Sequence, residues 1–196
     1  MAFPYSWEEN FESGSVSASD PFQTETDTAN KLSISHYSNL ARYGLAPHGG
    51  TYALLVDQPV GNNTNAFVSK TSSLDLGLGV TRFIRFYFYL SNQFSMTSGE
   101  GATLLEVRDD IGPICKAGLK VKTDNKLYFW LAQSDFAASE SPQELALDEV
   151  KVWFTGDTEA TLHDSLARWY HVEVRLIRDD GPSQNGTLTA WVNDTQ

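Results

Sequence analysis

The sequence predicts an all-β protein, an antiparallel sandwich or barrel. Three observations lead to this prediction: strand-like segments recur along the chain, turn residues separate them, and no segment keeps an apolar helical stripe for three turns. Many short strands with turns between them are typical of these two architectures. With 196 residues, the chain is long enough for one sizeable core, so we expect a single domain over residues 1–196.

The predicted strands are rich in Val, Ile, Thr and aromatic residues and are bounded by Gly, Asn, Asp or Pro. In chain order they span residues 31–36, 51–56, 65–70, 81–90, 102–109, 116–123, 126–133, 149–154, 169–177 and 187–193. The nearest approach to a helix is SPQELALDEV, residues 141–150, which continues directly into the predicted strand KVWF.

Two segments resemble hairpin turns, RDDIGP at residues 108–113 and RDDGPSQNGT at residues 178–187. Asp or Asn followed by Gly supplies the backbone conformations that hairpin loops need. The aspartate pairs Asp109/Asp110 and Asp179/Asp180 would also suit calcium, a hard cation with oxygen ligands. Neither pair belongs to an alternating D-x-D-x-D loop, so turn formation is the favoured reading. Calcium is the one cofactor that these residues would suit.

Side chains alternate between the two faces of a strand, so the spacing predicts which residues form the core. The inward residues expected are Ile84, Phe86, Phe88, Leu90, Leu127, Phe129, Leu131, Tyr170, Val172, Val174, Leu176, Leu188, Ala190 and Val192. The outward residues expected are Phe83, Arg85, Tyr87, Tyr89, Tyr128, Trp130, His171, Glu173, Arg175, Trp191 and Asn193. The outer faces of the sheets therefore bear many aromatic side chains.

Charge and composition exclude several classes of partner. The net charge is −11, whereas nucleic-acid binding relies on clustered Lys and Arg, so no nucleic acid is expected. No run of about 18 apolar residues is present, so no membrane insertion is expected. The first residues lack the basic and apolar regions of a signal peptide, and the localisation stays open. The single cysteine, Cys115, is expected to be a buried thiol.

Several segments together resemble a known family. WEENFESGS, GGTYALLV, TRFIRFYFYL with TLLEVRD, AGLKV with NKLYFWL, and ARWYHVEVRL with GTLTAWVND follow one another in the same order as in the laminin-G-like jelly rolls of the concanavalin A-like lectin/glucanase superfamily. The resemblance covers most of the chain, from about Trp7 to Asp194, and its motifs are structural. It implies a jelly-roll sandwich, glycan binding or adhesion, and a location outside the cell or on a virion surface.

The resemblance also implies strands that this sequence lacks. Family members continue past the position of Gln196, so the resemblance leaves two alternatives: the chain is a fragment that lacks the final strands, or these strands are dispensable. In a fragment, the first strand, around residues 8–12, would be an edge strand without its partner.

The enzymes of the superfamily provide a second reading, a polysaccharide lyase or hydrolase. The glucanase pattern E-x-D-x-E is absent, because Glu144, Asp148 and Glu149 have the wrong spacing for one face of a strand. A lyase would need a base beside a group that neutralises a uronate. His171 with Glu173 and Arg175, or Tyr87 with Arg85, could supply such an array. Solvated cross-strand ion pairs are the favoured explanation for these residues.

A carbohydrate-binding role fits the outward aromatics better, because sugar rings stack on aromatic side chains while their hydroxyls accept and donate hydrogen bonds. If strands 81–90 and 126–133 share a sheet, five residues form one concave ligand-binding platform: Arg85, Tyr87, Tyr89, Tyr128 and Trp130. Lys116, Lys120 and Lys122 would add positive charge suited to an acidic glycan. The alternatives are that a loop or partner subunit covers these aromatics, and that the chain is a structural module of a larger assembly.

Overall fold

Among the described residues of the computed structural model, β-strands predominate and every strand pair is antiparallel. The predicted all-β class is therefore confirmed. The structure describes residues 11–13, 24–27, 32–41, 45–56, 66–69, 79–90, 96, 99, 101–108, 112–123, 126–133, 143–148, 168–177 and 186–193. The chain divides into two compact units, residues 1–74 and 75–196. The single domain expected over the whole chain stays a prediction.

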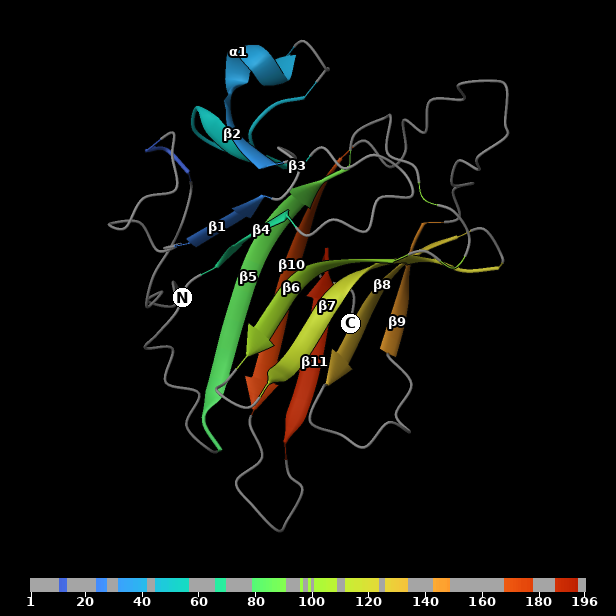
Figure 1. Cartoon of the computed structure of the whole chain (residues 1–196). Coiled ribbons are helices and arrows are strands. Elements are labelled where there is room, and N and C mark those ends of the chain that lie inside the picture. Colours follow the sequence, from blue (N-terminus) through green and yellow to red (C-terminus); the bar gives the residue numbers. More distant parts are fainter. Residues whose placement is uncertain are drawn as a thin grey trace. The chain divides into compact units, whose positions relative to one another are not determined.

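The first unit contains two pairs of strands and one short helix (Figure 1). The elements are β1 (Thr24–Asp27), β2 (Leu32–His36), α1 (Tyr37–Leu40), β3 (Tyr52–Val56) and β4 (Ala66–Ser69). β1 pairs with β4, and β2 pairs with β3. The helix α1 begins directly after β2, and Nδ1 of His36 accepts a hydrogen bond from the backbone N–H of Ser38. A polar side chain at this position satisfies a backbone donor that the helix leaves unpaired.

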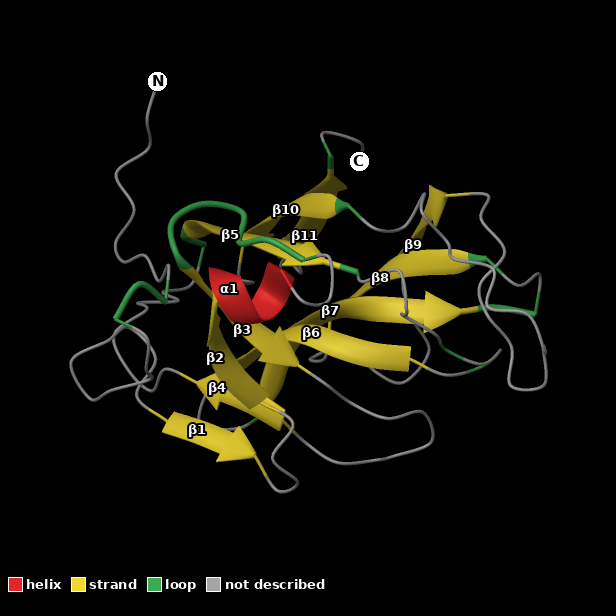
Figure 2. Ribbon diagram, turned by 90° about the horizontal axis from the view of Figure 1, so that it is seen from above, coloured by secondary structure: helices red, strands yellow, loops and turns green. Residues whose placement is uncertain are grey.

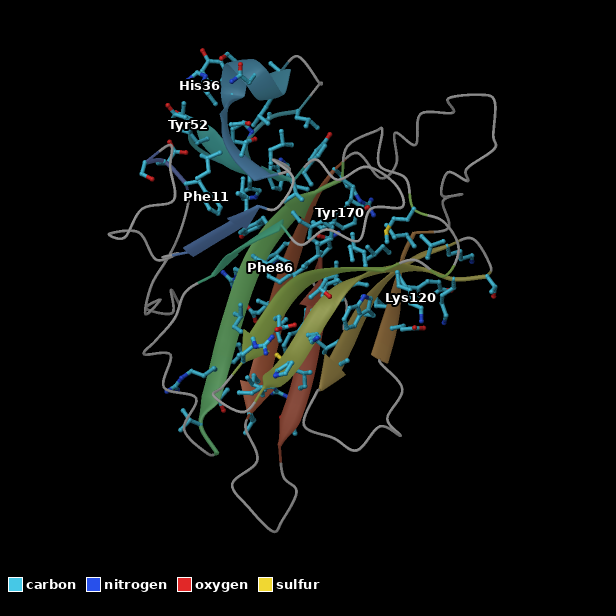
Figure 3. The ribbon with its side chains drawn as sticks, viewed as in Figure 1. Phe11, His36, Tyr52, Phe86, Lys120 and Tyr170 are labelled. Atoms are coloured by element: carbon cyan, nitrogen blue, oxygen red, sulfur yellow. The ribbon has the colours of Figure 1, made fainter. Side chains whose placement is uncertain are left out.

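Glu12 binds the start of β3 with its carboxylate. Its Oε1 accepts hydrogen bonds from the backbone N–H groups of Thr51 at 2.8 Å and Tyr52 at 3.0 Å. These bonds, with that from Tyr52 the stronger cause, lower the pKa of the Glu12 carboxyl below its ordinary value. Tyr52 in turn lies beside His36, with ring centroids 5.2 Å apart (Figure 3). Residues 11–13 form a turn, and the rest of the first strand expected at residues 8–12 lies outside the described residues.

The described residues of the second unit form two antiparallel sheets (Figures 1 and 2). Their strands are β5 (Thr81–Tyr89), β6 (Gly101–Arg108), β7 (Pro113–Val121), β8 (Leu127–Gln133), β9 (Gln143–Asp148), β10 (Trp169–Ile177) and β11 (Thr187–Val192). One sheet has the order β11-β10-β5 and the other the order β6-β7-β8-β9. Both predicted hairpins, β6 with β7 and β10 with β11, pair as expected. The predicted strand at residues 149–154 lies outside the described residues.

The two sheets share one hydrophobic core, which is a sandwich-like arrangement. Alternation is strict on β10, where Tyr170, Val172 and Val174 are fully buried. The predicted inward residues of β8 are buried as well. On β5, Ile84, Phe86 and Phe88 face this core but are only partly buried. Their strand is the last in the order of its described sheet, so it has a neighbour on one side only.

Irregular positions adjust the register of the four-stranded sheet. Val107 pairs with Cys115 but Arg108 pairs with Pro113, so Ile114 is an extra residue, a β-bulge. The bulge lets both Ile114 and Cys115 point into the core, although they are adjacent. The expectation that Cys115 is a buried thiol is confirmed.

Candidate functional site

The structure separates the five residues predicted to bind a ligand. Arg85, Tyr87 and Tyr89 lie on β5 in the three-stranded sheet, whereas Tyr128 and Trp130 lie on β8 in the four-stranded sheet. The apolar faces of both sheets meet in the shared core, so the outward faces point away from each other. The expectation of one platform built from all five is therefore wrong. Period-two alternation determines the face of a residue, but it does not determine which strands are neighbours.

The outward residues of β5, β10 and β11 form what we call the aromatic face. Its members are Phe83, Arg85, Tyr87, Tyr89, Trp169, His171, Glu173, Arg175, Thr189 and Trp191. Pairs directly opposite one another across β5 and β10 are in contact. The ring of Tyr87 stacks on that of His171 at 5.0 Å, and Tyr89 meets Trp169 edge-on at 5.5 Å. Tyr87 is 42% exposed and Phe83 is 53% exposed.

The centre of the aromatic face is an ion pair. Arg85 and Glu173 are opposite each other on β5 and β10. Nε and Nη2 of Arg85 both donate to Oε2 of Glu173, at 3.1 and 2.5 Å. The positive charge of Arg85 is therefore neutralised within the face. Pairs of this kind, partly exposed to solvent, add little to the free energy of unfolding but orient both side chains.

Arg175 lies two positions after Glu173 on β10, and its contacts are with neutral side chains. Its guanidinium is 5.7 Å from the ring centroid of Trp191, and its Nη2 donates to Oγ1 of Thr189 at 3.2 Å. Its Nε is buried and has no hydrogen-bond partner. On the same strand, Nε2 of His171 is also buried without a partner.

Asn193, in the turn that ends β11, is hydrogen-bonded to β10. Its backbone adopts a positive φ of 47°, a conformation that Asn tolerates better than most residues. Oδ1 of Asn193 accepts from the backbone N–H of His171 at 3.0 Å, and the Asn193 N–H donates to the His171 carbonyl at 2.9 Å. These bonds hold the end of β11 in register beside His171.

The outer face of the four-stranded sheet, which we call the lysine face, is organised by ion pairs. The predicted outward lysines Lys116, Lys120 and Lys122 are all part of it. Glu106 bridges Arg108 at 2.6 Å and Lys116 at 3.0 Å. Partial burial opposes ionisation of Glu106, but hydrogen bonds from Lys116 and Arg108 prevail and lower its pKa.

Glu144 forms ion pairs with the other two lysines of the lysine face. It bridges Lys120, at 3.7 Å, and Lys122, and Lys120 lies on β7 in Figure 3. Four cations thus share two carboxylates across the lysine face, so that their charges are partly compensated.

The two aromatic residues of the lysine face are engaged in packing. The ammonium of Lys122 lies 4.5 Å from the ring centroid of Tyr128. Nε1 of Trp130 donates to the carbonyl of Leu119 at 3.1 Å, and its indole lies against Gly118. For these two residues the contacts favour the alternative in which the aromatics are packing residues.

The two residue arrays considered for a lyase come together on the aromatic face. Tyr87 and Arg85 on β5 are opposite His171 and Glu173 on β10. The rings of Tyr87 and His171 lie nearly parallel, however, with 22° between their planes, which is the geometry of stacking. In the described part of the chain, Glu173 is the one carboxylate on this face, and it is paired with Arg85.

The described residues show neither a metal-binding cluster nor a membrane-spanning helix. Among the described residues, no three His, Cys, Asp or Glu side chains gather closely enough to hold a metal ion. The aspartate pairs Asp109/Asp110 and Asp179/Asp180, considered for calcium, lie outside those residues. In the same part of the chain, no helix has both the length and the apolar character needed to cross a bilayer.

Strand pairing was the information that sequence reasoning lacked. Alternation already placed His171, Glu173, Arg175 and Trp191 outward, and the structure agrees. It could not show that these residues lie beside Tyr87 and Arg85. Trp169 was missed, although its period-two relation to His171 was a usable signal. No family model, curated protein or solved structure matches the chain.

Proposed function

We propose that the chain is a non-catalytic carbohydrate-binding or adhesion module of the laminin-G-like, jelly-roll type, and that it binds a glycan on the aromatic face. The proposal rests on one observation: exposed rings stand beside hydrogen-bonding side chains on the same three strands. Phe83 and Tyr87 are the large exposed aromatic residues of this face. Arg85 and Glu173 stand next to them, and Thr189 lies one strand further, opposite Arg175. Aromatic surfaces with a few polar groups are typical of sugar sites.

The spacing of the face supports an extended ligand. Outward residues on one strand repeat every second position, about 6.6 Å apart, and this is comparable with the length of one pyranose residue. Tyr89 and Tyr87 therefore offer two successive rings along β5, and Phe83 offers a third beyond Arg85. A linear oligosaccharide lying along the strands would meet rings and polar groups in turn.

Two other readings compete with this one. In a structural module of a larger assembly, a virion or cell-surface protein for example, a partner would cover Phe83 and Tyr87. In a retaining hydrolase, two carboxyl groups would stand about 5–5.5 Å apart. Within the described residues of the aromatic face, Glu173 has no second carboxylate beside it, which favours binding over hydrolysis.

The test is glycan binding by the purified chain on an array at neutral pH, with and without calcium. Tyr87→Ala should weaken binding about fivefold, since one aromatic stack contributes about 1 kcal/mol. Tyr128→Ala is the matched control, because Tyr128 lies on the opposite sheet, and it should leave binding unchanged. If the parent protein binds no glycan at millimolar concentration, the structural-module reading replaces the proposal. Release of unsaturated uronates, followed by absorbance, would favour the lyase.

A further inference from the structure

Arg175 has no carboxylate partner among the described residues, in contrast to the cations of the ion pairs described above. Arg85 is paired with Glu173, and Lys116, Lys120, Lys122 and Arg108 are paired with Glu106 or Glu144. The contacts of Arg175 are the ring of Trp191 and the hydroxyl of Thr189, both neutral. Within the described residues, its positive charge is therefore not compensated, and an anionic group of a ligand would compensate it.

The guanidinium of Arg175 is also held in place before any ligand arrives. Trp191 supports its flat surface, and Thr189 fixes Nη2. Nε is buried without an acceptor, so a ligand arriving from solvent would meet the terminal Nη groups rather than Nε. A guanidinium presents its donors as a fork that matches the two oxygens of a carboxylate. An arginine fixed in this way loses little further freedom on binding an anion.

Phe83 lies directly beside this cation. It pairs with Arg175 across β5 and β10, and residues opposite each other in a sheet have Cβ atoms about 4.5–5.5 Å apart. With 53% of its surface exposed, Phe83 offers a ring on which a sugar could stack while an acidic substituent of that sugar reaches Arg175.

We propose that the glycan bound by the aromatic face contains a sugar carboxylate, which Arg175 binds while the sugar ring stacks on Phe83. This inference rests on the proposed glycan-binding function and names the class of ligand. One arginine accommodates one acidic group, and the net charge of −11 disfavours a densely charged polyanion. The ligand expected is a uronate-containing oligosaccharide.

The test compares acidic and neutral forms of the same oligosaccharide. Oligosaccharides that each contain a single galacturonate, glucuronate or mannuronate are titrated beside counterparts whose carboxylate has been reduced to an alcohol. The parent protein should bind its best acidic oligomer at least about tenfold more tightly than the reduced form, as expected for hydrogen bonds to a charged group. Arg175→Gln should abolish this difference and bind the reduced form as the parent does. Arg175→Lys, which keeps the charge without the fork, should retain part of the preference.

Lys116→Gln is the control for net charge, because it removes one cation from the opposite sheet. It should leave the preference for the acidic form intact; an equal loss in Lys116→Gln and Arg175→Gln would overturn the inference. If the parent protein binds acidic and reduced oligomers equally, the acidic subsite is refuted and glycan binding stands. If it binds none of the panel in either form while the array of neutral glycans gives a ligand, the subsite is again refuted. If no sugar binds at all, both proposals fail.

Discussion

Gly118 lies in the middle of β7, where the neighbouring strand and an indole leave no room for a side chain. A Cβ built there would lie 2.0 Å from the carbonyl oxygen of Ala102 and 2.9 Å from Nε1 of Trp130. The first contact is with backbone, which cannot turn away as a flexible side chain can. Gly118→Ala must therefore push β6 away from β7, displace Trp130, or both.

The magnitude follows from these contacts. Forcing extra volume into a packed site costs about 1–3 kcal/mol. Displacing Trp130 also weakens its hydrogen bond to the Leu119 carbonyl, a net loss of about 0.5–1.5 kcal/mol. Alanine also lowers the conformational entropy of the unfolded chain, and this offsets the loss by about 0.4–1 kcal/mol. We expect Gly118→Ala to lower the free energy of unfolding by about 2 kcal/mol, a fall in Tm of roughly 4–8 °C.

The assay is urea unfolding followed by circular dichroism, with Gly112→Ala as the matched control. Gly112 precedes β7, and a Cβ there would meet nothing within 4 Å, so its replacement should leave the midpoint almost unchanged. Adding Trp130→Ala to Gly118→Ala should not restore stability, because the contact with Ala102 remains. Equal midpoints for Gly118→Ala and Gly112→Ala would refute the packing of β6, β7 and Trp130 described above.

Two further predictions test the face assignment and the anchoring of Glu12. Phe86→Ala should lower the free energy of unfolding by about 3 kcal/mol, whereas Phe83→Ala, on the opposite face of the same strand, should cost well under 1 kcal/mol by urea titration; the reverse ranking would invert the faces of β5. Because the pKa of Glu12 is lowered in the folded state, its stabilising effect is present above its ordinary value of 4.5 and is lost as the pH falls through the lowered pKa. The amide resonances of Thr51 and Tyr52 should follow this titration by NMR and lose it in Glu12→Gln; amides that titrate identically in the variant would show that another group is responsible.

The strands and their faces could be predicted because one side of each strand meets an apolar core. Alternation along β5, β8, β10 and β11 identified the inward residues correctly. β9 was missed, since Gln143–Asp148 is composed of good helix formers. In the structure its Leu145 and Leu147 join the core and Glu144 turns outward to the lysines, so tertiary contacts override local preference.

The candidate site could not be assembled from sequence, because it depends on a pairing between distant strands. Arg85 and Glu173 meet across 88 positions of the chain. Nothing local to either residue indicates the other, and both sheets offer outward aromatics of similar character. The sequence was sufficient to propose the kind of chemistry, but the choice between β8 and β10 as the neighbour of β5 required the fold.

The strand β10 shows how core and site depend on each other. It is the central strand of its sheet, and it presents Tyr170, Val172, Val174 and Leu176 to the core and His171, Glu173 and Arg175 to the aromatic face. Sliding β10 by one residue would exchange these sets, burying three polar side chains and exposing four apolar ones. The core therefore fixes the register, and the register sets Arg85 opposite Glu173 and Phe83 opposite Arg175. A mutation that loosens the core side of β10 should accordingly weaken the proposed glycan binding without touching the aromatic face.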